Sequence, residues 1–295
     1  MVQSTAQEGY VAVTGGRVWY RMVGSGNAIP LLTLHGGPGY PHDYLEPLEN
    51  LAGERRVIFY DQLGCGRSDR PEDLSLWRIA RFVEEMGQVR AALGLHRVHL
   101  LGHSWGTMLA TDYVLTRPAG LVSLILASPA LSIPRWMADA DKYRRALPAE
   151  VREVLDRHEA ADTMESEDYQ AATMQYYMRH VCRIDPWPGP LQRTVAGAGL
   201  PVYNTMWGPS EFLVTGNLSA YDRTGRLREI TLPTLVTCGR HDEATPETTA
   251  RYASLIPGSE LAVFDDSAHM PHLEETARFL QVVRDFLARA ENTPR

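Results

Sequence analysis

The segment Val98–Val114, VHLLGHSWGTMLATDYV, decides the fold. Its apolar run ends at Gly102, Ser104 follows, and the chain takes up helical spacing after Gly106. Glycines at such a junction let a helix pack closely against a strand. The same G-x-S-x-G pattern also forms a strained turn that lifts a serine hydroxyl out of the backbone as a nucleophile. The pattern alone fits both interpretations, so the rest of the chain has to decide between them.

The segments on either side of this junction alternate between two periodicities. Short apolar runs that end in glycine-rich or polar turns are typical of buried strands, and apolar residues three or four apart are typical of amphipathic helices. We expect strands within 18–24, 30–39, 55–69, 97–104, 121–130, 232–239 and 259–266, and helices within 75–95, 105–118, 247–257 and 271–290. Strands that alternate with helices form βαβ units, so the sequence predicts an α/β fold with a mostly parallel central sheet.

The composition changes after Ser132. From there to about Arg226 the chain is rich in helix formers and aromatic residues, and it has few β-branched runs. The strand–helix alternation then resumes. We therefore expect a core whose first part is 1–131, a helical cap insertion over 132–226, and the second part of the core over 227–295.

Composition and charge exclude several classes of protein. The 295 residues are 44% hydrophobic and 22% charged, as in ordinary globular proteins. A formal net charge of −7 argues against a nucleic-acid surface and leaves room for a local acidic site that attracts a cation. The three cysteines lack metal or redox spacing, which indicates a reducing compartment. With no signal-peptide pattern and no apolar run near the ~20 residues that a membrane span needs, we expect a cytoplasmic protein.

A nucleophilic serine needs a base and an acid that orients this base. In open α/β sheets such groups lie on loops beyond the carboxyl ends of the strands, in the chain order serine, acid, histidine. Asp242 follows the late strand 232–239, and His269 follows the last strand. Histidine suits the base because its unperturbed pKa is about 6.5, and a buried carboxylate fixes its tautomer. The sequence thus predicts a triad of Ser104, Asp242 and His269.

Other histidines and aspartates offer alternatives to this choice. We expect His272 to point away from the site, because it lies one turn into the closing helix. His103 lies inside the turn of the nucleophile, where we expect it to pack or to line the pocket. Asp265 and Asp266 stand at the same strand end as His269 and would leave the earlier loop unused.

The loop HGGPG, 35–39, follows an early strand at the place where such folds put a donor for an oxyanion. We expect the backbone N–H groups of Gly37 and Trp105 to converge on one substrate oxygen. Pro38 has no N–H, so it stiffens the turn and donates nothing.

Five motifs together carry a family resemblance: HGGPG, YDQLGCGRSD, GHSWG, GPSEF and GRHDEATP. With them the chain resembles the proline iminopeptidases, serine peptidases with the α/β-hydrolase fold, over nearly its whole length. This resemblance implies an α/β-hydrolase fold with an inserted helical cap. It also implies release of an N-terminal residue, proline or another small apolar residue, from peptides, amides or arylamides. At His103 the chain departs from the family, whose members usually carry a small residue there, often glycine.

Family members hold the free α-amine of the substrate with acidic side chains from the cap and from the loop beside the catalytic acid. The matching positions here are Glu211 in GPSEF and Glu243 in GRHDEATP. An ammonium that leaves water loses several kcal/mol of solvation unless carboxylates meet it. The resemblance therefore implies that Glu211 and Glu243 bind the substrate amine.

Other functions on the same fold stay open. A prolyl-amide hydrolase, or an esterase or lactonase of a biosynthetic pathway, would need Ser104 and His269 equally, but a neutral ester has no use for Glu211 and Glu243. Ser104 excludes the epoxide hydrolases and dehalogenases, whose nucleophile is a carboxylate. A non-catalytic binding protein is disfavoured by the intact triad and oxyanion loop.

We expect no metal and no cofactor, because the chain lacks the H-E-x-x-H, P-loop and dinucleotide-binding motifs. The expected partner is a small molecule or short peptide with a free amino terminus, and neither nucleic acid nor membrane. The oligomeric state, the leaving group and the role of His103 are not readable from the sequence.

Overall fold

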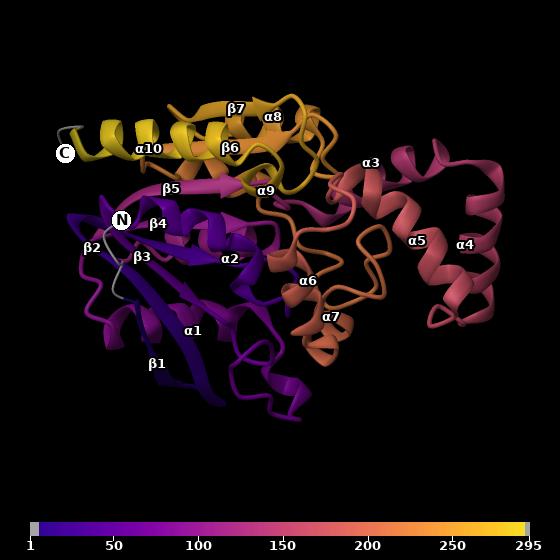
Figure 1. The fold of residues 1–295 in the computed structure, drawn as a ribbon, viewed down its shortest axis with the longest axis horizontal. Coiled ribbons are helices and arrows are strands. Elements are labelled where there is room, and N and C mark those ends of the chain that lie inside the picture. Colours follow the sequence, from indigo (N-terminus) through magenta and orange to yellow (C-terminus); the bar gives the residue numbers. More distant parts are fainter. Residues whose placement is uncertain (1–5, 293–295) are drawn as a thin grey trace.

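The computed structural model describes residues 6–292, which build a seven-stranded sheet with helices on both faces (Figure 1). The strands are β1 (Ala6–Val13), β2 (Gly16–Leu34), β3 (Arg55–Tyr60), β4 (Val98–His103), β5 (Leu121–Ala127), β6 (Thr234–Gly239) and β7 (Glu260–Phe264). Their order is β1-β2-β4-β5-β6-β7, with β3 also paired to β2. The pairs β2–β4, β4–β5, β5–β6 and β6–β7 are parallel. The prediction of a mostly parallel sheet is confirmed.

Strand β2 differs from the expectation of two separate strands. The register of its pairing with β3 shifts between Val23 and Leu31, but the pairing resumes beyond the shift. Strand β3 pairs with β2 on both sides of this shift. The expected turn between two strands is therefore an irregularity within one long strand. Only the second half, Leu31–Leu34, pairs in parallel with β4.

Helices and 3-10 turns cover the two faces of the sheet. They are η1 (His42–Leu51), η2 (Leu74–Leu76), α1 (Ile79–Ala92), α2 (Trp105–Leu115), α8 (Pro246–Leu255), α9 (Pro271–Glu274) and α10 (Thr276–Asn292). Apolar side chains of α1, α2 and α8 pack in one buried cluster, and those of η1 and α10 pack in another. The expected closing helix is broken at Glu275, whose φ of −125° and ψ of 49° are not helical. Glu274 there accepts hydrogen bonds from the N–H groups of Ala268 and Met270, so it anchors the chain behind β7.

A group of helices lies between β5 and β6 and projects beyond the sheet (Figure 1). They are α3 (Ile133–Arg145), α4 (Ala149–Ala161), α5 (Glu167–His180), α6 (Gly189–Ala196) and α7 (Leu200–Met206), followed by η3 (Thr224–Glu229). The two ends of this group are tied together, since Ser132 forms a bridge with Asp222 and the N–H of Arg223 donates to the carbonyl of Leu131. The helices also contain an apolar cluster of their own. The division at 131/132 and 226/227 stays a prediction that these contacts support.

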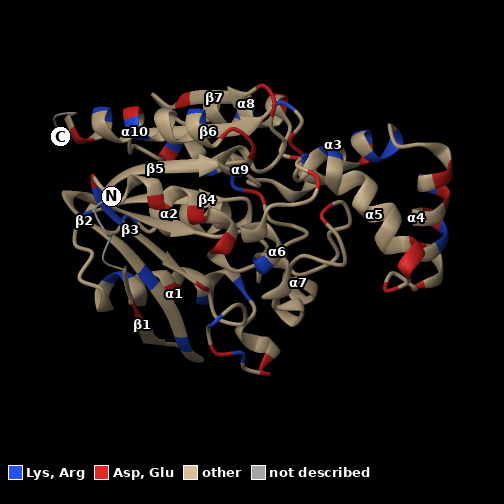
Figure 2. Ribbon diagram, in the orientation of Figure 1, with Lys and Arg blue, Asp and Glu red and all other residues tan. Residues whose placement is uncertain are grey.

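Charged side chains are distributed unevenly over the fold (Figure 2). The central strands are largely free of them, whereas acidic residues gather on α4 and on the turn that leads to α5. Two of these acids, Asp162 and Glu165, line a cavity of about 820 Å³. Within residues 6–292, no helix is both long and apolar enough to cross a membrane.

Candidate active site

Ser104 occupies a strained turn between β4 and α2. Its φ of 54° and ψ of −123° are unusual for a residue with a side chain. A Cβ on Gly102 would come within 2.3 Å of the Gly106 carbonyl oxygen, and a Cβ on Gly106 within 2.1 Å of the Leu34 carbonyl oxygen. The strained turn and the close packing that the opening motif predicts are therefore both present. The glycines allow close packing, and this packing holds Ser104 in its strained turn.

Asp242 and His269 lie on the loops that follow β6 and β7, and a 2.7 Å hydrogen bond joins the Nδ1 of His269 to the Oδ1 of Asp242. The carboxylate also accepts from the N–H groups of Ala244 and Gly239. Both side chains are buried. Because a carboxylate accepts, the Nδ1 of His269 carries the proton and its Nε2 is left as a proton acceptor.

Ser104 and His269 line the same cavity, which has a volume of about 820 Å³. Among the described residues, the structure records no hydrogen bond between the Ser104 hydroxyl and His269. The Nε2 of His269 lies 4.0 Å from the Oε1 of Glu243. A hydrogen bond between a catalytic serine and its histidine often forms fully only when substrate is bound. The hydroxyl of Ser104 and the imidazole of His269 thus share one cavity, and the buried carboxylate of Asp242 is hydrogen-bonded to this imidazole.

The loop that contains Gly37 lies against the turn of Ser104. A Cβ on Gly36 would be 3.0 Å from the Cβ of Ser104, and Gly37 has a φ of +107° that favours glycine. Trp105 is the first residue of α2, so its N–H has no acceptor within the helix. The structure thus brings both expected donors of the oxyanion site to the neighbourhood of Ser104.

Gln62 is a functional candidate that sequence reasoning missed. Its side chain accepts from the Nε1 of Trp105 at 2.8 Å and donates to the carbonyl of His35 at 3.1 Å, and its N–H donates to the Nε2 of His35. Gln62 therefore connects the oxyanion loop to the first residue of α2. The signal was its place in the DQLGCG motif, directly after a buried strand.

Glu211 and Glu243 reach the cavity from opposite parts of the chain. Glu211 follows α7, and its Oε1 accepts from the hydroxyl of Tyr203 at 2.8 Å. Glu243 follows the triad acid and is only 1% exposed, yet neither of its carboxylate oxygens has a hydrogen-bond partner. A buried carboxylate without donors is costly unless a ligand supplies them. Both oxygens of Glu243 therefore remain free to accept hydrogen bonds from a ligand in the cavity.

The surroundings of the two carboxyl groups disfavour their charged forms. Burial raises the pKa of Glu211 to about 7. Burial, followed by the negative charges of Glu211 and Asp242, raises the pKa of Glu243 well above its ordinary value. A positive charge in the cavity would reverse this effect on both groups.

The rival residues do not join this constellation. Asp265 pairs with Arg240 at 2.7 Å, away from the cavity. His272 is buried, and its ring packs on His103 with centroids 5.0 Å apart. His272 does not line the cavity, as expected, but it is buried in the interior, which was not expected. It lies in α9, a short helix that turns inward, and not in the first turn of α10.

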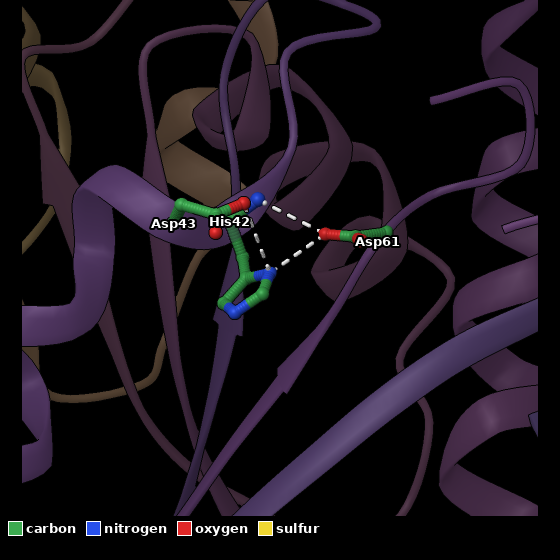
Figure 3. Close-up of side chains that lie close together, drawn as sticks. All are labelled: His42, Asp43 and Asp61. Atoms are coloured by element: carbon green, nitrogen blue, oxygen red, sulfur yellow. Dashed lines mark hydrogen bonds and ion pairs between the residues drawn. The ribbon is translucent and has the colours of Figure 1, made fainter. Parts of the chain in front are cut away.

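Figure 3 shows a second cluster of titratable side chains, His42, Asp43 and Asp61. The Nδ1 and the N–H of His42 both meet the Oδ1 of Asp61, at 2.7 and 3.1 Å. Asp43 lies 3.2 Å from Arg67 and 3.4 Å from Arg193, and the N–H of Arg67 donates to Asp61. Because arginines and histidine already supply donors to these carboxylates, the cluster does not fit a metal ion. It joins η1 to the loop after β3.

Comparison with known proteins agrees with the geometry. Residues 29–276 match the family model of the alpha/beta hydrolase fold. The proline iminopeptidase of Heyndrickxia coagulans is 50% identical over 282 residues, which cover 95% of this chain and 98% of that protein. The crystal structure of VinJ has a TM-score of 0.93 and 39% identity and covers 96% of this chain and 99% of that one. The crystal structure of the proline iminopeptidase of Mycobacterium smegmatis has a TM-score of 0.89 and 40% identity, with coverages of 96% and 98%.

Half of the residues are shared with a proline iminopeptidase over nearly the whole length of both proteins. The structure agrees with this match in its sheet order, in the strained turn of Ser104 and in the cavity between the sheet and the inserted helices. The resemblance seen in the sequence is thereby confirmed: this chain belongs to the proline iminopeptidase family of α/β-hydrolases.

Proposed function

We propose that this serine aminopeptidase releases an N-terminal residue, proline or another small apolar residue, through an acyl-enzyme on Ser104. Its substrates are peptides, amides or arylamides with a free amino terminus. The observation that carries the proposal is Glu243, whose two buried oxygens have no hydrogen-bond partner although this residue lines the cavity of Ser104. A neutral ester gives no reason to bury such a group. The cytoplasmic location expected from the sequence stays a prediction.

The chemistry follows from the roles that we assign to the triad. His269 takes the proton of the Ser104 hydroxyl through its Nε2 while the oxygen attacks the substrate carbonyl. The developing oxyanion accepts hydrogen bonds from the N–H groups of Gly37 and Trp105. The C–N bond then breaks, and His269 gives its proton to the leaving amine. Water, deprotonated by His269, hydrolyses the ester and restores Ser104. Asp242 stabilises the imidazolium that forms twice in this cycle.

The carboxylates position the substrate for this attack. The α-ammonium of the substrate is one carbon away from its reactive carbonyl. An ammonium held by Glu211 and Glu243 therefore fixes the carbonyl close to Ser104, because all three residues line one cavity. An acylated amine has lost its positive charge and leaves the two carboxyl groups without a counter-charge. We expect the enzyme to discriminate against such substrates.

The test compares three substrates in the wild type and in the Glu211→Gln and Glu243→Gln variants. They are a prolyl arylamide, its N-acetyl form and a simple aryl ester. We expect each variant to lose about 10²-fold or more in kcat/KM for the free amine, since a buried charge pair contributes several kcal/mol. The aryl ester should lose far less. The two losses should be non-additive, because both carboxylates hold one group.

Glu165→Gln is the matched control, since Glu165 is exposed and also lines the cavity. It should change none of the three activities by more than a small factor. Equal losses for all three substrates in the Glu211 and Glu243 variants would contradict the amine anchor. They would favour the alternative, an esterase or lactonase on the same scaffold.

A further inference from the structure

His103 is the last residue of β4 and directly precedes Ser104. Its side chain is 1% exposed, and both ring nitrogens form hydrogen bonds. The Nδ1 lies 2.9 Å from the hydroxyl of Tyr44, which comes from η1. The Nε2 lies 2.8 Å from the backbone carbonyl oxygen of His269. One side chain therefore connects two segments that approach Ser104 from different sides.

The hydrogen bond continues from Tyr44 to the oxyanion loop. The N–H of Gly36 donates to the Tyr44 hydroxyl at 2.7 Å, and Gly36 directly precedes Gly37. The connection thus runs from Gly36 through Tyr44 and His103 to the backbone of His269. Its two ends are the loop of the expected oxyanion donor and the residue that we assign as the base.

The direction of each hydrogen bond follows from the chemistry of its partners. A carbonyl oxygen only accepts, so the Nε2 of His103 carries a proton that points at His269. A neutral imidazole has one N–H, so the Nδ1 of His103 accepts the proton of the Tyr44 hydroxyl. This hydroxyl in turn accepts from Gly36. In this arrangement the N–H of Gly36, the hydroxyl of Tyr44 and the Nε2–H of His103 each have an acceptor. It requires that the ring of His103 is neutral.

The surroundings favour this neutral ring. Burial, together with the facing rings of His269 and His272, lowers the pKa of His103 well below its ordinary value. The groups that face it are Tyr44 from η1, His269 after β7 and His272 from α9, and the ring centroids of His103 and His269 are 4.7 Å apart. A charged His103 would repel the imidazolium that forms at His269 during catalysis. The neutral ring avoids this repulsion.

We propose that His103 is a positioning residue, which holds the Gly36–Gly37 loop and the backbone of His269 at fixed places on either side of Ser104. The proposal rests on the proposed function, because it needs Ser104 and His269 in their assigned roles. His103 itself transfers no proton, since its only N–H faces a carbonyl oxygen. Its effect is on the geometry of the transition state and not on the binding of the substrate amine.

Three variants test this role. His103→Leu removes both hydrogen bonds, whereas His103→Gln keeps an N–H for the His269 carbonyl and an oxygen for the Tyr44 hydroxyl. Tyr44→Phe keeps the ring but removes the hydroxyl, and with it the hydrogen bonds to Gly36 and to the Nδ1 of His103. Misplacement of an oxyanion donor or a base by about 1 Å costs about 10²-fold in rate. We therefore expect the Leu variant to lose about 10²-fold in kcat with KM within about twofold. The Gln variant should recover at least tenfold of this loss.

A second measurement separates positioning from general damage. The boronic acid analogue of proline forms a tetrahedral adduct on a catalytic serine, whereas proline itself is the released product. In the Leu variant, the affinity for the boronic acid should fall in parallel with kcat/KM, and the affinity for proline should be unchanged. His272→Leu is the matched control. His272 is a buried neighbour of His103 whose Nε2 has no hydrogen-bond partner, and this variant should keep its kcat.

The outcomes distinguish this proposal from the proposed function. Turnover in Ser104→Ala would overturn the proposed function. An inactive Ser104→Ala variant together with a normal kcat in His103→Leu would overturn the positioning role alone. So would equal losses in the Leu and Gln variants. If the Leu variant does not fold, Tyr44→Phe decides, because it deletes one oxygen atom: about tenfold lower kcat supports the role, and a normal kcat overturns it.

Discussion

The surroundings of Glu211 disfavour its charged carboxylate form. The free energy of unfolding therefore depends on pH through this group. Its pKa is raised from 4.5 to about 7, chiefly by burial. The folded state therefore binds more protons than the unfolded state between these two pH values. The stability that the protonated carboxyl contributes is fully present below pH 4.5, and it is lost as the pH rises through about 7.

We predict that Glu211→Gln stabilises the protein at alkaline pH while it abolishes the preference for free amines. Glutamine is neutral at every pH, so the melting temperature of the variant should exceed that of the wild type by a few degrees at pH 8. The difference should vanish near pH 4.5, where the wild-type carboxyl is protonated. Thermal unfolding at a series of pH values measures this, with Glu165→Gln as control. A Tm difference that is independent of pH would contradict the assigned cause.

The junction of β4 and α2 shows how one element constrains another. Gly106 lies in the first turn of α2, where a Cβ would come within 2.1 Å of the Leu34 carbonyl oxygen and 2.9 Å of that of His35. These are backbone atoms of the last residue of β2 and of the first residue of the 35–39 loop, and they have little freedom to move. The helix therefore fixes the distance between Ser104 and the 35–39 loop.

We predict that Gly106→Ala reduces kcat by at least 10²-fold or prevents folding, because either α2 or the end of β2 must shift. Gly87→Ala is the matched control in α1. A Cβ there meets only the Tyr113 ring at an ordinary 3.7 Å, and alanine is the better helix former by roughly 0.5–1 kcal/mol. The control should keep its activity and gain slightly in Tm. The measurements are kcat and Tm of the two purified variants. A fully active Gly106→Ala variant would refute this account of the junction.

At the scale of the whole molecule, the formal net charge is −7, and some of the acidic residues lie along the cavity. Acidic residues gather on α4 and the turn to α5 (Figure 2), and Asp162 and Glu165 of this turn line the cavity. A cleft lined by one sign of charge raises the local concentration of the opposite ion and accelerates its association. We therefore expect the helices between β5 and β6 to favour the approach of substrates that carry an ammonium group.

We predict that kcat/KM for a prolyl arylamide falls by several-fold between about 10 mM and 500 mM salt, because the screening length shortens from about 30 Å to less than 5 Å. The neutral aryl ester should show no such dependence. Steady-state kinetics at constant pH measures both substrates. A salt effect of equal size on the two would mean that salt acts on the enzyme and not on the encounter with a cation.

The sequence by itself determined the features that depend on neighbouring residues. The glycines around Ser104 predicted its strained turn, the strand–helix rhythm predicted a mostly parallel sheet, and the strand ends before Asp242 and His269 predicted where these side chains lie. Each follows from local periodicity or from the rule that the carboxyl ends of parallel strands meet at one edge. The acidic residues Glu211 and Glu243 were found through resemblance to known enzymes.

Only the tertiary structure decided the features that depend on residues far apart in the chain. Sequence patterns gave no reason to connect His103 with Tyr44 and the His269 carbonyl, nor to expect His272 in the interior. The same holds for Glu243, because a carboxylate becomes an orphaned, buried group only when other segments cover it without supplying donors. Hydrogen-bond partners and desolvation are set by the packing of distant segments, and no local spacing encodes them.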